Sequence, residues 1–525
     1  MARILVVEDD AEQREMRRML FERAGHNVAV AADAERADAA PLADVVVMDL
    51  HLPSAKDGAA LIRRLRARSP APRIVVLTGA ADSPEAQLAD AVVAKPCRSA
   101  KLMEIVSRLL VLLVCLASIG GAATIPFRVT RATEVVAEIA MASPGADWSV
   151  SGREAALATL AVDGKTQQHV MLYAGAARQI YRVFLGALTA GDHSLFIERN
   201  ARFSAPGAGL EVAGATFTEA PAGDATVANA PVLFARANTL GKFSDVPAAL
   251  YCERLVENGK PLLQYTAIFS NEDGGTSTRA LMARWGRTTD IEYIYRVWLD
   301  PAGRASRATI QAKDHKEVEY RGRREGAHPV LIPVTDNNMV APDGSTPIRY
   351  QLAPVVVDLA GTSREAVMDA QPFTYRVMAQ ELAREGKLRP FGTVDGEKIS
   401  DPRNYLYIEA RVQNRDSRSA FLVRLKSERR WRVSHVGKIE LAIERDGWVR
   451  STVELPPATT PDRIAEFGFE CLIKEKTPTG ACRIEEIGKL FFLDRDYRPS
   501  ASFWSLKPAA DVPAGEILTW SFESK

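Results

Sequence analysis

The stretch Val45-Val46-Val47-Met48-Asp49-Leu50-His51-Leu52-Pro53 decides the fold of the N-terminal part of this chain. It opens with four apolar residues, mostly β-branched, which predict a short strand buried on both faces, as in a parallel sheet. The strand ends in the carboxylate of Asp49. Open α/β sheets bind ligands beyond the carboxyl ends of their strands, so we expect Asp49 to be a metal ligand, a nucleophile or both.

Three more runs of apolar residues end in polar side chains. Because ligands of an open α/β sheet bind at the carboxyl ends of its strands, these side chains belong to the same expected site as Asp49. Helical patterns separate the runs, so we expect a parallel sheet with helices on both faces. The runs are Ile4–Val7 before Glu8-Asp9-Asp10, Ile74–Leu77 before Thr78, and Ala91–Ala94 before Lys95.

A helix is predicted after each of these strands and after a further short strand. The first helix carries Met16, Met19 and Leu20 at helical spacing and stops at Gly25, a residue type that commonly ends helices. The fourth begins at a Ser-Pro-Glu cap and has room for about two turns. The predicted helices cover Glu12–Ala24, Asp33–Ala40, Gly58–Arg68, the residues after Ser83, and Lys101–Leu110.

This order of an acidic pair, a lone aspartate, a hydroxyl and a lysine resembles the receiver domain of two-component response regulators. The resemblance covers residues 1–108 and implies a doubly wound, flavodoxin-like α/β fold with a parallel five-stranded sheet. It implies phosphorelay signalling in which Asp49 accepts a phosphoryl group that Thr78 and Lys95 contact. The implied partner is a sensor histidine kinase or a phosphotransfer protein. The receiver would at most catalyse its own phosphorylation and dephosphorylation, so an enzyme is not expected.

The same resemblance implies a bound Mg²⁺ ion. The cation prefers oxygen ligands in near-octahedral geometry, and it would relieve the repulsion between clustered carboxylates. Asp10, the third acid of its run, is expected just outside the site. The implied metal ligands are Glu8, Asp9, Asp49 and the backbone carbonyl of His51.

Composition limits the classes of protein that fit. At 525 residues the chain has room for about three or four domains, and its 47% hydrophobic and 25% charged residues are ordinary for a globular protein. A net charge of +1 provides no field for nucleic acid, so no nucleic-acid partner is expected. The five cysteines lack C-x-x-C spacing, which argues against a structural zinc module. All seven tryptophans lie beyond residue 140, which indicates a different architecture there.

The segment 109–127 carries no charged residue and begins with a solidly apolar run. Its length just reaches that of a transmembrane helix, which would put the receiver in the cytoplasm and the later domains outside, at the membrane. The segment also has the form of a secretory signal, which would release the later domains after cleavage near Ala123. Met103 would then start a second reading frame, fused to the receiver. A third interpretation is that the segment extends the last receiver helix into a core or partner interface.

Residues 128–525 change to short strands broken by turn residues, which predicts mostly-β, sandwich-like domains. A helix is expected at 374–384. Cys471 and Cys482 flank a turn and would form a disulfide if exported, leaving Cys252 unpaired. We assign a β-sandwich domain to 128–218, a linker to 219–231, a β-rich domain with the helical segment to 232–392, and a sandwich-like domain to 393–525.

The β-rich residues carry no catalytic motif that would name their ligand. The loop Asn271-Glu272-Asp273-Gly274-Gly275 has Ca²⁺-binding residue types but is more typical of a hairpin turn. The best-supported function is therefore phosphorelay signalling coupled to a membrane-anchored β-rich ectodomain. The alternative is a secreted β-rich protein that binds a glycan or a protein, with the receiver joined as a fused frame. A secreted hydrolase ranks last.

Overall fold

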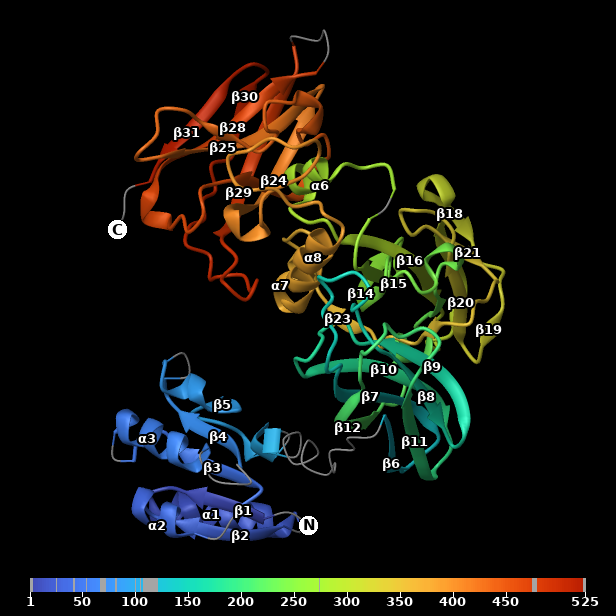
Figure 1. Ribbon diagram of the computed structural model, residues 1–525, viewed down its shortest axis with the longest axis vertical. Coiled ribbons are helices and arrows are strands. Elements are labelled where there is room, and N and C mark those ends of the chain that lie inside the picture. The colour runs from blue at the N-terminus through green and yellow to red at the C-terminus, as the bar shows by residue number, and fades with distance from the viewer. Residues whose placement is uncertain are drawn as a thin grey trace. The chain divides into compact units, whose positions relative to one another are not determined.

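The computed structural model of this chain describes residues 3–24, 26–40, 43–52, 54–66, 72–80, 83–99, 101–103, 105–106, 121–272, 274–474 and 479–522. The chain divides into two compact units, one made mainly of residues before Ile119 and one mainly of residues after it (Figure 1). The first is an α/β unit and the second is mostly β. Both properties of the fold were predicted from the sequence.

The first unit contains the predicted parallel five-stranded sheet, in the order β2-β1-β3-β4-β5. The central strand β3 is buried along its whole length, because helices cover both faces of the sheet. Its apolar side chains contribute to two hydrophobic cores, one on each face. The strands are β1 (Arg3–Val7), β2 (Asn27–Ala31), β3 (Val45–Asp49), β4 (Arg73–Thr78) and β5 (Ala91–Ala94).

Helices of this unit follow the predicted order, with one exception. The predicted fourth helix is only a turn of 3-10 helix, η1 (Ala86–Leu88). Its segment is short, and the backbone N–H of Asp90 already donates to the Ile74 carbonyl at 2.9 Å, which returns the chain to the sheet at once. The other helices are α1 (Ala11–Arg23), α2 (Ala34–Ala39) and α3 (Ala55–Arg66), and residues 99, 101–103 and 105–106 are helical too.

The predicted apolar face of α1 is wrong in part: Leu20 packs against the core, but the two methionines do not. Met16 and Met19 are 53% and 41% exposed, whereas Arg17 and Phe21 are buried. Arg17 turns inward because it forms an ion pair with the buried carboxylate of Glu8. A polar residue therefore replaces an apolar one on the inner face of this helix.

The predicted hydrophobic helix at 109–127 is wrong at its C-terminal end. Residues 122–127 belong to strand β6 (Ala122–Val129), which pairs with β11 (Gly191–Arg199). Burial alternates along β6 because successive side chains of a strand point to opposite faces. Residues 109–120 lie outside the described residues, and none of the helices that the structure describes is long and apolar enough to cross a membrane.

The second unit begins with two antiparallel sheets, β10-β7-β12 and β6-β11-β8-β9. The backbone of β10 also bonds to residues 351–353, which joins this part to a later segment. Short helix α5 (Ala225–Ala228) lies in the predicted linker. The further strands are β7 (Thr133–Ala142), β8 (Leu157–Val162), β9 (Lys165–Met171), β10 (Gln179–Leu188) and β12 (Glu211–Glu219).

Two mixed sheets follow, one in the order β19-β20-β13-β22 with β21 on β20, the other in the order β18-β17-β16-β15-β14-β23. Helix α8 (Phe373–Arg384) confirms the helix predicted at 374–384, and α6 (Thr278–Trp285) and α7 (Ala366–Ala370) were not predicted. The strands are β13 (Val232–Phe234), β14 (Pro247–Glu257), β15 (Lys260–Phe269), β16 (Asp290–Leu299), β17 (Ala305–Ala312), β18 (Lys316–Glu319), β19 (Arg324–Glu325), β20 (His328–Pro333), β21 (Val340–Pro342), β22 (Arg349–Tyr350) and β23 (Val355–Val357).

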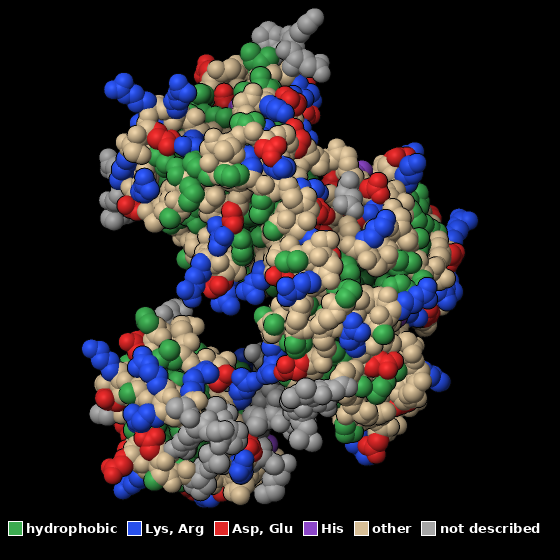
Figure 2. All heavy atoms as spheres, viewed as in Figure 1, with side chains coloured by type: hydrophobic (Ala, Val, Ile, Leu, Met, Phe, Trp, Pro, Cys, Tyr) green, Lys and Arg blue, Asp and Glu red, His purple; other side chains and the backbone are tan. Residues whose placement is uncertain are grey.

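The C-terminal strands form a sandwich of two sheets, β27-β24-β29-β30 and β26-β25-β28-β31, which share one hydrophobic core. A disulfide joins Cys471 of one sheet to Cys482 of the other, as predicted, and Cys252 is free and buried. Charged side chains of both signs are interspersed on the face of the molecule seen in Figure 2. The strands are β24 (Tyr405–Arg415), β25 (Ser417–Leu425), β26 (Arg432–Val433), β27 (Gly447–Glu454), β28 (Ile464–Ile473), β29 (Ala481–Phe491), β30 (Ala510–Pro513) and β31 (Ile517–Ser521).

Candidate phosphoacceptor site

The candidate site lies at the carboxyl ends of four neighbouring strands. Glu8 follows β1, Asp49 ends β3, Thr78 ends β4 and Lys95 follows β5. The strand register aligns these ends, since Asp49 pairs with Leu77 and the Lys95 N–H donates to the Thr78 carbonyl at 2.8 Å. The structure thus brings together side chains that lie up to 87 positions apart, from Glu8 to Lys95.

Three carboxylates form the acidic part of the site. Oxygens of Glu8, Asp9 and Asp49 lie within 4.8 Å of one another, and this is the one such group of potential metal ligands among the described residues. Asp9 is exposed, whereas Glu8 and Asp49 are 1% and 9% exposed. Clustered carboxylate oxygens, open to solvent on one side, fit a hard cation such as Mg²⁺, which keeps part of its water shell.

A lysine forms an ion pair with the carboxylate of Asp49. Nζ of Lys95 lies 2.6 Å from Oδ2 of Asp49 and 3.9 Å from Oε2 of Glu8. The other oxygen of Asp49, Oδ1, accepts a hydrogen bond from the backbone N–H of His51 at 3.1 Å. The carboxylate of Asp49 is therefore held in one orientation before any ligand arrives.

The hydroxyl of Thr78 lies at the end of the neighbouring strand. The side chain is 1% exposed, and its Oγ1 accepts a hydrogen bond from the backbone N–H of Ala80 at 3.1 Å. Its hydroxyl hydrogen therefore remains available to donate to an incoming oxygen. Asp10, by contrast, caps α1 by accepting from the N–H of Gln13 at 2.8 Å.

Sequence reasoning missed Arg17, which pairs with Glu8 from the inner face of α1. Burial lowers the pKa of the Arg17 guanidinium, and the negative charge of Asp49 opposes this shift. The guanidinium supplies the counter-charge that a buried carboxylate at position 8 requires. Its signal in the sequence is an arginine four positions before Phe21, the apolar residue that α1 buries.

Gly58 positions the loop that follows Asp49. A Cβ at this place in α3 would collide with the backbone carbonyl of Leu50. The missing side chain lets the helix approach the loop that starts directly after Asp49 and carries His51. A glycine inside a helix lowers stability relative to alanine, and the close approach of the Leu50 carbonyl explains why one is present here.

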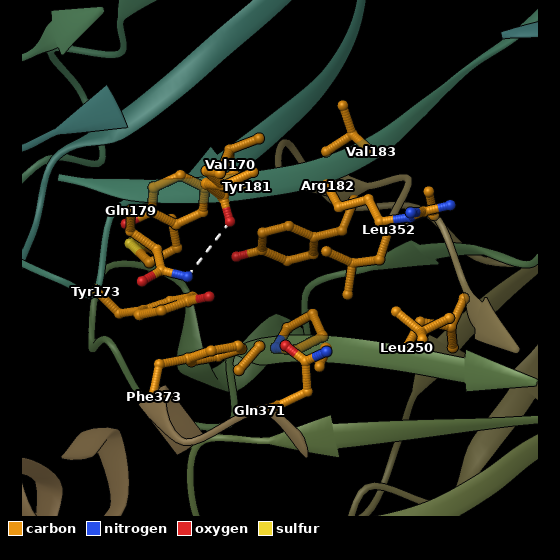
Figure 3. A pocket seen from close by; sticks show the side chains of 18 of the residues that line it. Val170, Tyr173, Gln179, Tyr181, Arg182, Val183, Leu250, Leu352, Gln371 and Phe373 are labelled. Atoms are coloured by element: carbon orange, nitrogen blue, oxygen red, sulfur yellow. Dashed lines mark hydrogen bonds between the residues drawn. The ribbon is translucent and has the colours of Figure 1, made fainter. Parts of the chain in front are cut away.

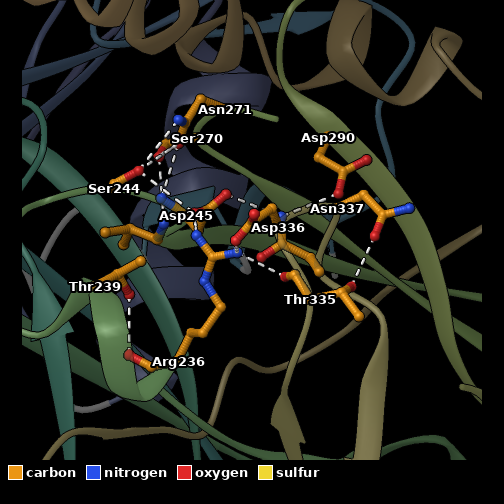
Figure 4. Close-up of polar contacts among 12 residues, drawn as sticks. Arg236, Thr239, Ser244, Asp245, Ser270, Asn271, Asp290, Thr335, Asp336 and Asn337 are labelled. Carbon is orange, nitrogen blue, oxygen red and sulfur yellow. Dashed lines mark hydrogen bonds and ion pairs between the residues drawn. The ribbon is translucent and has the colours of Figure 1, made fainter. Parts of the chain in front are cut away.

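The loop 271–275, whose residue types suit Ca²⁺, connects β15 to helix α6 instead of forming the expected hairpin. Asp273 lies outside the described residues. Oδ1 of Asn271 already accepts hydrogen bonds from the backbone N–H of Asp245 at 2.8 Å and from Ser270 at 3.0 Å (Figure 4). This amide oxygen is engaged in a buried polar network, so the loop's geometry does not indicate a cation site.

Residues 4–107 match the family model of the response regulator receiver domain. The chain is 43% identical over 79 residues to the virulence transcriptional regulatory protein PhoP of Shigella flexneri, covering 14% of this chain and 35% of that protein. It is 41% identical over 81 residues to PhoP of Salmonella typhimurium, covering 15% and 36%. The chain thus spans about a third of the length of these curated relatives.

Solved structures match the same segment. The response regulator TrrA of Thermotoga maritima, in complex with Mg²⁺ and BeF, is 26% identical, with 21% of this chain and 100% of that chain covered and a TM-score of 0.20. A CheY-like receiver domain from Methylobacillus flagellatus is 28% identical, with 21% and 98% covered and a TM-score of 0.20. With the family match and the strand-end site, the N-terminal segment of this chain is a response regulator receiver domain.

Proposed function

We propose that this chain is a phosphorelay signalling protein in which Asp49 accepts the phosphoryl group. The observation that carries the proposal is the Asp49 carboxylate within one cluster with Glu8 and Asp9 and 2.6 Å from Lys95. The donor would be a phosphorylated sensor histidine kinase or phosphotransfer protein. Apart from its own phosphorylation and dephosphorylation, we assign the chain a signalling role and not an enzymatic one.

In the proposed reaction an oxygen of Asp49 attacks the phosphorus of the donor. A new P–O bond forms as the bond from phosphorus to the donor's leaving group breaks. Lys95 then moves its charge from the carboxylate to the phosphoryl oxygens, and the Thr78 hydroxyl donates to one of them. Both groups therefore stabilise the negative charge on the phosphoryl oxygens after transfer.

Glu8, Asp9, Asp49 and the His51 carbonyl would hold the Mg²⁺ ion. When bound, the cation supplies positive charge that offsets the repulsion between the carboxylates and the phosphoryl oxygens. Glu8 is paired with Arg17 and Asp49 with Lys95, so the exposed Asp9 is the acid with most freedom to accept it. Glu8 would then contribute through its charge or through a water molecule.

The test is phosphorylation of the full-length chain by acetyl phosphate and Mg²⁺, followed by intact mass measurement. We expect one added phosphate that is labile in base, absent in Asp49→Ala and absent after chelation of Mg²⁺. The matched control is Asp57→Ala, an exposed acid in the first turn of α3, which should be phosphorylated like the wild type. A base-labile phosphate that persists in Asp49→Ala would overturn the assignment.

For the second unit we propose a location outside the cytoplasm, coupled to a cytoplasmic receiver through the uncharged residues 109–121 that precede β6. The supporting observation is the Cys471–Cys482 disulfide, because structural disulfides persist mainly in oxidising compartments. Mass measurement of the native N-terminus separates the alternatives. A chain that begins at Met1 or Ala2 and sediments with membranes supports an anchored regulator. A chain that begins near Ala123 supports a secreted β-rich protein and rules out the coupling.

A further inference from the structure

A cavity of about 390 Å³ lies in the second unit, far in sequence from the receiver. Its lining comes from β9, β10, β14, β22 and β23, with the start of α8 at one end (Figure 3). Small-molecule sites commonly occupy about 300–1,000 Å³. In volume, this cavity resembles a ligand site.

Aromatic rings form one wall of the cavity. Tyr173 stacks on Phe373 with ring centroids 5.3 Å apart and meets the edge of Tyr181 at 5.2 Å. Figure 3 shows Tyr173, Tyr181 and Phe373 together at one end of the lining. Aliphatic side chains such as Leu250 and Leu352 complete the lining. A ligand with a ring would find both a stacking surface and an apolar enclosure.

Some polar groups of the lining have no described hydrogen-bond partner, whereas Glu138, Gln179, Tyr181 and Arg182 each have one. Tyr173 and Tyr350 are 5% and 3% exposed, and their hydroxyls have no hydrogen bond to any residue that the structure describes. Burial raises the pKa of both phenols, so both keep their protons and can donate. The side-chain amide of Gln371 is likewise without a described partner. These groups are therefore available to bond to a ligand in the cavity.

The cavity offers no net charge to a ligand. The charged side chains in its lining are Glu138 and Arg182, which face each other on paired strands at 3.2 Å. Their charges offset one another, and the rest of the lining is mostly apolar. A charged ligand would lose its hydration without gaining a counter-ion. A sugar, with a hydroxyl on almost every carbon, would leave most of its polar groups unpaired here.

We propose that this cavity binds an uncharged, largely apolar, ring-containing small molecule that carries one or two hydrogen-bonding groups. The aromatic wall holds the ring of the ligand, and the hydroxyls of Tyr173 and Tyr350 bond to its polar group. This site is independent of the phosphoacceptor function of the receiver. It gives the β-rich unit a ligand class of its own.

The test uses the purified full-length chain and N-phenyl-1-naphthylamine. This uncharged amine joins a phenyl ring to a naphthalene, and its fluorescence rises in apolar sites. We expect saturable binding to one site. Val355→Trp, which fills the cavity, should weaken this component about tenfold or more. The matched control is Val356→Trp, the next residue on β23, which is 46% exposed and absent from the lining. It should keep the wild-type affinity within about twofold.

Two further binding measurements test the hydroxyl of Tyr350 and the preference for an uncharged ligand. Tyr350→Phe removes one hydroxyl at nearly constant shape and should weaken binding about threefold or more. The sulfonated analogue 1-anilinonaphthalene-8-sulfonate has the same rings plus a negative charge and should bind at least about tenfold more weakly. No saturable component, equal losses in Val355→Trp and Val356→Trp, or tighter binding of the sulfonate would overturn the proposal. Displacement of the probe by glucose or another free sugar would replace the proposed ligand class with carbohydrate.

Discussion

Nζ of Lys95 lies 2.6 Å from Oδ2 of Asp49, so the proposed phosphoacceptor is already in an ion pair. Any cation or phosphoryl group that reaches Asp49 must compete with this lysine. The pair therefore has two opposite effects. It weakens metal binding to the free carboxylate, and it provides a counter-charge for the phosphoryl group after transfer.

Lys95→Gln should separate these two effects. We expect Mg²⁺ to bind about threefold or more tightly, because the competing positive charge is gone, and phosphorylation by acetyl phosphate to slow by about tenfold. Titration calorimetry and intact mass measurements check the two results. Lys56→Gln, which removes an exposed lysine of α3, should change neither. An unchanged Mg²⁺ affinity in Lys95→Gln would contradict this role of the ion pair.

Arg17→Met should destabilise the receiver by about 3–5 kcal/mol, since it leaves the buried carboxylate of Glu8 without its partner. Adding Glu8→Gln should recover much of that loss. The measurement is urea-dependent hydrogen exchange of the β3 peptide, followed by mass spectrometry. The neighbouring Arg18, whose pairs with Glu15 and Glu22 are more exposed, is the control. Arg18→Met should cost less than about 1 kcal/mol, and an equal cost for both arginines would refute the argument.

Gly58→Ala should destabilise the receiver although alanine is the better helix former. The added Cβ would meet the Leu50 carbonyl, and overpacking of this kind typically costs about 1–3 kcal/mol. Gly79→Ala is the control, because a Cβ there meets nothing within 4 Å. Urea-dependent hydrogen exchange of the β3 peptide again measures the change in the free energy of unfolding. Stabilisation by Gly58→Ala would show that the helix can move away from the loop without cost.

Removal of the Cys471–Cys482 disulfide should lower the stability of the C-terminal sandwich by about 2–3 kcal/mol. The bridge closes a short loop, with a sequence separation of 11, and so restricts the unfolded chain only moderately. Thermal unfolding followed by tryptophan fluorescence, with and without reductant, measures this difference. The double variant Cys471→Ala, Cys482→Ala should show no response to reductant. Alkylation of both thiols in the untreated native protein would mean that the bridge is absent.

The second unit should lose stability as the pH rises from about 4 towards 8. Burial raises the pKa of the Asp290 carboxyl from its ordinary 3.8 to about 7, so the folded state favours the protonated acid (Figure 4). Below about pH 4 the acid is protonated in both states, and its contribution to the free energy of unfolding is fully present. This contribution is lost as the pH rises through about 7, because the folded protein must then hold a buried charge. Tryptophan fluorescence reports on this unit alone, because every tryptophan lies beyond residue 140.

Asp290→Asn should reduce this pH dependence, because the amide has nearly the same shape and does not ionise. Part of the slope should remain, since burial raises the pKa of Glu272 and of Glu381 to about 7 as well. Asp300→Asn is the control, since Asp300 lies in a surface turn where the backbone N–H of Arg304 lowers the pKa of its carboxyl. That variant should keep the wild-type slope between pH 4 and 8. A wild-type slope in Asp290→Asn would assign the pH dependence to other groups.

The sequence alone was enough for the receiver sheet and for the grouping of its site residues. A strand buried on both faces requires a continuous apolar run, and such runs are visible locally. The residue after each run must lie at the carboxyl edge of the sheet, where neighbouring strand ends meet. Asp49, Thr78 and Lys95 could therefore be placed together without any knowledge of the packing. The same local logic predicted the helix at α8 and the pairing of Cys471 with Cys482.

Other features depend on which distant residues meet. The inner face of α1 was only partly predicted, because a hydrophobic pattern cannot show that Arg17 has a buried carboxylate as its partner. The short 3-10 turn replaced a helix because Asp90 bonds back to the sheet. The cavity in the second unit combines residues from Glu138 to Phe373, and no segment of the chain carries its signature. Local pattern determines an element and its end, whereas charge pairing and cavities are decided only when elements far apart in the sequence pack together.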